Sequence, residues 1–146
     1  MSAITKDDIV VTETGYKMAR ITMDREKLSA AVKGFLGMFD REIYDMAICI
    51  GTYSTFFAGT VCDKTKKAAL VCSNPECIGK KISPGMKTVI FSDVLTDGQD
   101  VLSVIRSVEK AGGSVIRLGF IAEDSSKGAR KARVLRGYPF EALTVI

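Results

Sequence analysis

The sequence contains no histidine and no tryptophan, and only three of its 146 residues are proline. The absence of histidine excludes imidazole acid–base catalysis, Ser-His-Asp and Cys-His nucleophile systems, and most zinc sites. The four cysteines include no Cys-x-x-Cys pair, and we expect them to be reduced thiols. A disulfide between Cys72 and Cys77, across a short loop, is the alternative.

Long apolar stretches are also missing. No apolar run approaches the ~20 residues that a membrane-spanning helix needs, so we expect no membrane partner. The first residues lack an apolar signal region, which predicts a cytoplasmic protein. The net charge of +4, from 21 basic and 17 acidic residues, is too small to indicate nucleic-acid binding by itself.

The pattern of apolar residues predicts an α/β fold. Apolar residues make up 47% and charged residues 26% of the chain, which fits one globular domain. Short runs rich in Val and Ile predict strands at 46–50, 68–72, 88–91, 114–121 and 142–146. Apolar residues at helical spacing predict helices at 24–39, 55–62 and 99–111, and stricter alternation predicts a hairpin at 9–23. This order favours a doubly wound, mostly parallel sheet flanked by helices.

The segment from Val89 to Asp100 reads as a strand, a polar loop and the start of an amphipathic helix. A loop in this position exposes backbone N–H groups at the positive end of the helix, which can bind an anion. An acidic residue at the end of the strand, here Asp93, can face a ribose diol or a bound Mg²⁺. The alternative is an ordinary turn in which Asp97 or Asp100 caps the helix.

This segment resembles the fingerprint of the type I phosphoribosyltransferase family. That fingerprint is an apolar strand, two acidic residues, two aliphatic residues and a Thr-Thr-Gly-Gly-Thr-like loop. Residues 92–100, Ser-Asp-Val-Leu-Thr-Asp-Gly-Gln-Asp, follow it position by position. Residues 44–52 resemble the family's first core strand leading into its pyrophosphate loop. Residues 14–17, followed by Asp24 and a helix, are similar to the N-terminal hood of orotate phosphoribosyltransferases.

The resemblance implies a parallel sheet that binds phosphoribosyl pyrophosphate at the carboxyl ends of its strands. In the family, the fingerprint loop holds the 5′-phosphate, the acidic pair holds the ribose hydroxyls, and Mg²⁺ and backbone amides hold the diphosphate. Asp93 is then the candidate catalytic and Mg²⁺-binding residue. Tyr16 and Tyr53 are candidates for stacking on a base, and ordinary packing is the alternative for both. The family also implies a homodimer. The candidate ligand-binding residues are Thr52, Tyr53, Ser54, Ser92, Asp93, Thr96, Asp97, Gly98, Gln99 and Asp100. The expected division is a single domain at 1–146, with a hood hairpin at 1–23 and a core at 24–146.

The candidate site departs from the family pattern in its charges. Ser92 stands where the first acidic residue is expected and adds no charge to hold Mg²⁺. Asp97 and Asp100 replace hydroxyl donors, and an ionised carboxylate cannot donate a hydrogen bond to a phosphate. Two unit charges ~4 Å apart, at an effective dielectric of ~20, repel by roughly 4 kcal/mol. That repulsion exceeds the helix-end attraction of about 0.3–1 kcal/mol. Residues 73–83 are also short for a closing lid.

We therefore interpret the chain as a phosphoribosyltransferase-like protein that binds a phosphoribosyl or nucleotide ligand, with weak or absent transferase activity and a regulatory or sensing role. One alternative is an active orotate or purine phosphoribosyltransferase in which Asp93 suffices and Asp97 turns outward. A further alternative is an interaction domain without a ligand. The basic run at 127–136 would suit nucleic-acid phosphates in a regulator. We favour a solvated linker or helix between the last two strands, paired with Glu123 and Asp124, and expect no nucleic-acid partner.

Overall fold

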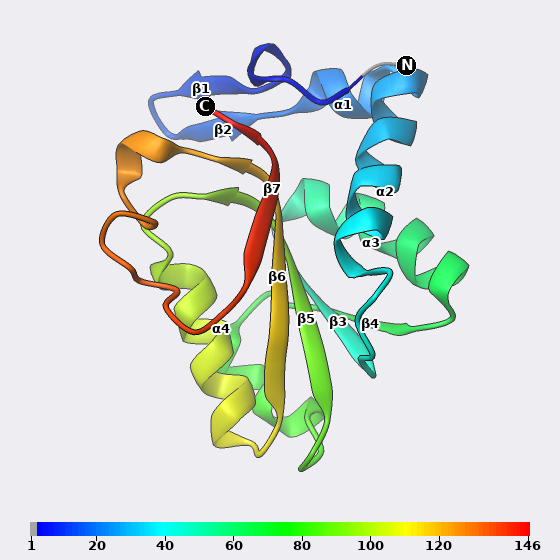
Figure 1. The fold of residues 1–146 in the computed structure, drawn as a ribbon, viewed down its shortest axis with the longest axis vertical. Helices are drawn as coiled ribbons and strands as arrows, with labels where there is room; N and C mark the ends of the chain where they lie inside the picture. Colours follow the sequence, from blue (N-terminus) through cyan, green and yellow to red (C-terminus); the bar gives the residue numbers. More distant parts are fainter. Residues whose placement is uncertain (1–2) are drawn as a thin grey trace.

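The computed structural model describes residues 3–146, apart from the side chain of residue 77. Its centre is a five-stranded sheet of order β4-β3-β5-β6-β7, in which every neighbouring pair is parallel. The strands are β3 (Met46–Ile50), β4 (Ala68–Val71), β5 (Lys87–Leu95), β6 (Ser114–Glu123) and β7 (Phe140–Val145). The predicted α/β fold with a parallel sheet is therefore confirmed (Figure 1).

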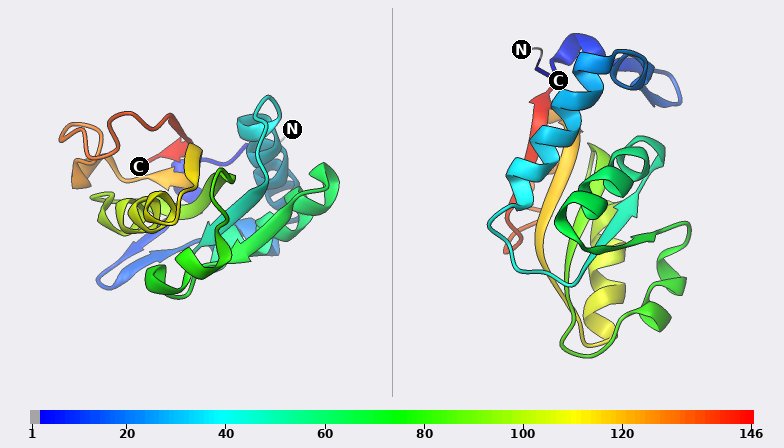
Figure 2. Two further views of the ribbon diagram at one scale, coloured as in Figure 1. Left: turned by 90° about the horizontal axis from the view of Figure 1, so that it is seen from below. Right: turned by 90° about the vertical axis from the view of Figure 1, so that its right-hand side faces the viewer.

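Helices cover both faces of the sheet (Figures 1 and 2). On one face lie α2 (Arg25–Phe39) and α3 (Thr52–Thr65), and on the other lie α4 (Gln99–Lys110) and the short 3-10 helices η2 (Pro75–Cys77) and η3 (Gly79–Lys81). No helix within the described part of the chain is long and apolar enough to cross a membrane.

Aromatic stacking fixes α2 against the sheet. The ring of Phe91 in β5 stacks on the rings of Phe35 and Phe39, with centroids 5.1 and 4.6 Å apart. All three side chains are buried. Asp24 starts the helix, because its side chain accepts hydrogen bonds from the amides of Glu26 and Lys27. The cap expected from the sequence is therefore present.

The N-terminal hood lies across the carboxyl ends of the central strands (Figure 1). It consists of η1 (Lys6–Asp8), β1 (Val10–Thr12), β2 (Gly15–Lys17) and the helix α1 (Ala19–Met23). The predicted hairpin at 9–23 is thus shorter than expected. Met18 and Ile21 are buried at the start and in the middle of a helical turn, whereas Val11, on the strand, is 62% exposed.

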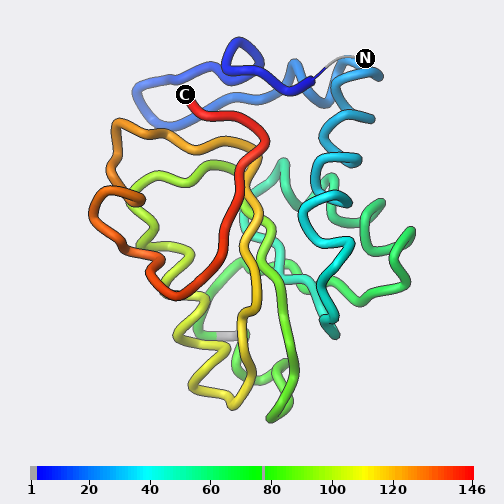
Figure 3. Tube along the Cα trace, in the orientation of Figure 1, coloured from blue at the N-terminus to red at the C-terminus, as the bar shows by residue number. Residues whose placement is uncertain are grey.

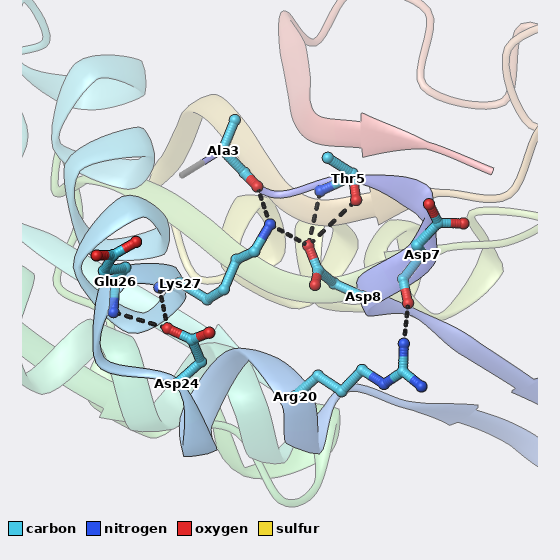
Figure 4. Close-up of polar contacts among 8 residues, drawn as sticks. All are labelled: Ala3, Thr5, Asp7, Asp8, Arg20, Asp24, Glu26 and Lys27. Carbon is cyan, nitrogen blue, oxygen red and sulfur yellow. Dashed lines mark hydrogen bonds and ion pairs between the residues drawn. The ribbon is translucent and has the colours of Figure 1, made fainter. Parts of the chain in front are cut away.

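An ion pair ties the hood to α2. Lys27 lies 3.0 Å from the carboxylate of Asp8 and donates a hydrogen bond to the carbonyl of Ala3 (Figure 4). The amide of Thr5 donates to the same carboxylate at 2.9 Å. Together these groups lower the pKa of Asp8 against the opposing effect of burial.

The connection between β6 and β7 folds back beside the loop that leaves β5 (Figure 3). It contains one short 3-10 helix, η4 (Ser125–Lys127), and otherwise turns. Arg130 pairs with the buried carboxylate of Glu123 at 2.9 Å and lies over the ring of Phe140. The expected linker between the last two strands, with a partner at Glu123, is therefore confirmed.

Candidate functional site

A cavity of about 240 Å³ lies at the carboxyl ends of β3 and β5, on the side where the hood crosses the sheet (Figure 1). The carboxyl ends of parallel strands are where α/β folds bind ligands. The cavity combines apolar walls with hydroxyls and two carboxylates. Its lining residues are Tyr16, Met18, Ile50, Gly51, Ser92, Asp93, Val94, Thr96 and Asp100.

Asp93 links the end of β5 to α3, the helix that follows β3. Ile50 of β3 pairs with Ser92 of β5, so the residues that follow them come side by side. The carboxylate of Asp93 accepts hydrogen bonds from the amide of Ser54 at 2.6 Å and from the amide of Tyr53 at 3.3 Å. Asp93 therefore supplies the capping acceptor for α3, which has no side-chain cap from its own N-terminal residue.

Gly51 allows this close approach. Its φ of +96° lies in the region that favours glycine. A Cβ at this position would lie 2.6 Å from the carboxylate of Asp93. The first turn of α3 and the end of β5 therefore fit together only around a residue without a side chain.

The environment of Asp93 acts on its proton affinity in two directions. Burial raises the pKa of Asp93, and the amide hydrogen bonds from Ser54 and Tyr53 partly offset that rise. The carboxyl group thus lies in a largely desolvated position at the N-terminal end of α3. A bound anion at α3 would compete with this carboxyl group for the same amides.

Side chains of the fingerprint loop, residues 96–100, also bond to nearby backbone amides. The carboxylate of Asp97 accepts a hydrogen bond from the amide of Gln99 at 3.0 Å, and that of Asp100 accepts one from the amide of Val101 at 2.8 Å. Gly98 starts α4 with a φ of +81°. Gly98, and neither aspartate, is thus the N-cap residue of α4, although both aspartates accept amide hydrogen bonds beside it.

The structure brings together most of the residues predicted from the sequence. Ser92, Asp93, Thr96 and Asp100 line the cavity. The first turn of α3, which contains Thr52, Tyr53 and Ser54, begins beside it, since Gly51 belongs to the lining. The exposed side chains of Asp97 and Gln99 lie outside the lining, as does the buried Gly98.

Tyr16 brings the hood into the site. Its hydroxyl donates a hydrogen bond to the carboxylate of Asp124 at 2.5 Å, just beyond the end of β6. Burial, together with this hydrogen bond, raises the pKa of Tyr16 to about 12. Hydrogen bonds from Ser126 and from Tyr16 lower the pKa of Asp124. The ring of Tyr16 thus lines the cavity, while its hydroxyl is bonded to Asp124 next to the end of β6.

The cavity residues that sequence reasoning missed are apolar or lack a side chain: Met18, Ile50, Gly51 and Val94. They carry no chemical signal of their own. Only the pairing of β3 with β5, and the crossing of the hood, place them at one site.

Comparisons with known proteins point to one group of enzymes. No protein-family model matches the chain. A xanthine phosphoribosyltransferase from Streptococcus mitis is 34% identical over 73 residues, which is 50% of this chain and 45% of the relative. An adenine phosphoribosyltransferase from Caldicellulosiruptor bescii is 42% identical over 57 residues, which is 39% of this chain and 31% of the relative. The matched segments therefore span less than half the length of these relatives.

Solved structures match over more of the chain. The adenine phosphoribosyltransferase from Rhodothermus marinus superimposes with a TM-score of 0.82 at 18% identity, covering 97% of this chain and 96% of that one. The enzyme of Giardia lamblia complexed with 9-deazaadenine gives 0.79 at 12% identity, covering 94% and 92%. These similarities show that the fold is the one found in phosphoribosyltransferase structures.

Proposed function

We propose that this protein is a purine phosphoribosyltransferase, which transfers the phosphoribosyl group of phosphoribosyl pyrophosphate to a purine base. The observation that carries the proposal is the cavity where Asp93 and Thr96 of the β5 end meet the first turn of α3 under the hood. The adenine and xanthine names of the relatives favour a purine over orotate. The orotate-like hood stays a prediction.

The proposed reaction needs no histidine. A ring nitrogen of the base forms a bond to C1′ of the ribose, the bond from C1′ to the diphosphate oxygen breaks, and the diphosphate leaves with the electron pair. The nitrogen proton passes to solvent or to the leaving group. Because the sugar becomes cation-like on the way, orientation and electrostatics do most of the catalysis. Asp93 supplies a negative charge beside that sugar, and Thr96 offers a hydroxyl to the 5′-phosphate.

The expected Mg²⁺ has few protein ligands here. Among the side chains that the structure describes, no group of three or more His, Cys, Asp or Glu residues could hold a metal ion. Asp93 is engaged by two amides, and its neighbour Ser92 is uncharged. These residues do not fit a metal site held by the protein, so we derive no step through Mg²⁺. An ion arriving with the substrate would depend on the diphosphate for its ligands.

A second candidate is ligand binding without turnover. The aspartates Asp93, Asp97 and Asp100 already accept hydrogen bonds from amides at the starts of α3 and α4. A diphosphate and a 5′-phosphate would need those amides and would meet negative charge there. This arrangement favours a protein that binds a phosphoribosyl or nucleotide ligand weakly and turns it over slowly or not at all.

A pyrophosphate-release assay separates the two candidates. The full chain is incubated with phosphoribosyl pyrophosphate, Mg²⁺ and adenine, xanthine, guanine, hypoxanthine or orotate in turn. Purine-dependent release that is lost in Asp93→Ala supports the proposed enzyme. Calorimetric binding of phosphoribosyl pyrophosphate or a nucleotide, without release, supports the second candidate. Neither binding nor release would leave an interaction domain, and sedimentation of the same sample tests the expected homodimer.

A further inference from the structure

A second hollow, of about 420 Å³, lies between α2 and α3 and shares no residue with the cavity of the proposed function. Both helices cover the same face of the sheet (Figure 2), and the hollow between them is a groove lined by side chains of both helices. The lining residues are Arg25, Leu28, Ser29, Val32, Lys33, Leu36, Phe56, Phe57, Thr60 and Lys64. We call this surface the α2–α3 groove.

The floor of the α2–α3 groove is apolar and regularly spaced. Leu28, Val32 and Leu36 follow one another at intervals of four, which places them on one stripe of α2. Phe56 of α3 is 58% exposed, and its ring meets the buried Phe57 edge-on at 5.8 Å. An exposed aromatic ring beside an apolar stripe is typical of a surface that a partner covers.

The rim of the groove is positively charged. Arg25, Lys33 and Lys64 line it and are exposed, and no acidic residue belongs to the lining. The nearby carboxylates of Glu26 and Asp63 lie outside it. A partner therefore needs an apolar stripe with negative charge on its flanks.

We propose that the α2–α3 groove docks an amphipathic helix of another protein, with an apolar stripe flanked by Asp or Glu residues. The lining residues on α2 run from Arg25 to Leu36, so they make a wall about 18 Å long at 1.5 Å per residue, which suits about three turns of a partner helix. A second copy placed groove against groove would set three cations against three. A lipid surface needs a protruding apolar face, whereas this one is concave.

The direct test is fluorescence anisotropy of the full chain with a designed probe. The probe is a fluorescein-labelled helical peptide of about 15 residues, with leucines at helical spacing on one stripe and glutamates beside it. Saturable binding is expected, and Phe56→Ser should weaken it by about tenfold or more. Phe56 is exposed, so circular dichroism should show an unchanged fold. Absence of saturation would overturn the proposal.

Charge reversal makes the test specific. A second peptide carries lysine in place of every glutamate. Lys33→Glu combined with Lys64→Glu should weaken the glutamate peptide by about tenfold or more and strengthen the lysine peptide. Lys110→Glu, in the last turn of α4, is the matched control and should change neither. Equal binding of both peptides to the unmodified chain contradicts the proposal.

Two further results would replace the proposal with another occupant. Concentration-dependent dimerisation that Phe56→Ser abolishes would assign the groove to a second copy. Co-sedimentation with phosphatidylserine–phosphatidylcholine vesicles, lost in the same variant, would assign it to a membrane surface. Failure of the pyrophosphate-release assay leaves the peptide result unaffected, because the two sites share no residue.

Discussion

The carboxylate of Asp93, near the carboxyl end of β5, lies 2.6 Å from the backbone nitrogen of Ser54 in the first turn of α3. A residue of β5 thus caps α3, the helix that follows the neighbouring strand β3. The same amides would receive a diphosphate in the proposed reaction. Asp93 therefore stabilises the fold but competes with a diphosphate for these amides. It favours folding and opposes binding of the diphosphate.

Replacing Asp93 by alanine should destabilise the fold. The change leaves the amides of Tyr53 and Ser54 without their acceptor, and the loss of a helix cap costs about 0.5–2 kcal/mol. We expect the lower part of that range, because burial raises the pKa of Asp93 and so opposes its ionised form. Urea unfolding at neutral pH measures the effect. The control is Asp40→Ala, because Asp40 lies at the C-terminal end of α2, where a carboxylate does not cap the helix. This variant should not lower the free energy of unfolding. Equal losses in both variants would contradict the capping role of Asp93.

The fingerprint loop should bind phosphate better once its carboxylates are removed. In the double variant Asp97→Thr and Asp100→Thr, hydroxyls replace two charges that now accept amide hydrogen bonds. Solvent screens these exposed groups, so we expect a gain of about tenfold, equivalent to about 1.4 kcal/mol, in affinity for ribose 5-phosphate. Calorimetric titration provides the measurement. Asp63→Thr on α3 is the control, and an unchanged affinity in the double variant would remove repulsion as the reason for weak binding.

The elements that the sequence predicts correctly are those that a local pattern of residues determines. The strands β3 and β6 are covered on both faces of the sheet, so β3 is an unbroken apolar run and β6 is an apolar run that contains Arg117. The helix predicted from Thr55 begins three residues earlier, at Thr52, because its cap comes from Asp93 on another strand. The hydrogen bond from Tyr16 to Asp124 joins residues 108 positions apart. No periodicity in the sequence encodes such a contact, so the family resemblance predicts the hood but not its hydrogen bond to the end of β6.

The hood should loosen in acid through Asp8. The amide of Thr5 and the ammonium of Lys27 lower the pKa of this carboxyl in the folded state (Figure 4). Its contribution is therefore complete above the unfolded value of about 3.9 and is lost as the pH falls through the lower folded value. The stability advantage over Asp8→Asn, about 1 kcal/mol at pH 6, should decline as the pH falls below about 4 and vanish only below the folded-state pKa.

Urea midpoints between pH 2 and pH 6 test this dependence. Asp7→Asn is the matched control, because Arg20 contacts the backbone carbonyl of Asp7 rather than its carboxylate. That variant should follow the unmodified protein at every pH. An advantage over Asp8→Asn that grows in acid would show that the ion pair with Lys27 does not hold the hood.

The stability of Gly98→Ala should show how closely the connection between β6 and β7 packs against the fingerprint loop. The residue has a φ of +81°, and an added Cβ would lie 3.1 Å from the side chain of Val134. Gly128 has nearly the same φ, +79°, but open space around it, so Gly128→Ala isolates the backbone cost of about 1–2 kcal/mol. We expect Gly98→Ala to cost about 1 kcal/mol more in urea unfolding, because Val134 must shift. Val134→Ala in the same chain should remove that excess and leave the backbone cost. Equal losses of stability in Gly98→Ala and Gly128→Ala would mean that the connection moves away from the added methyl group at little cost. The fingerprint loop would then be accessible to a phosphate from the side of Val134.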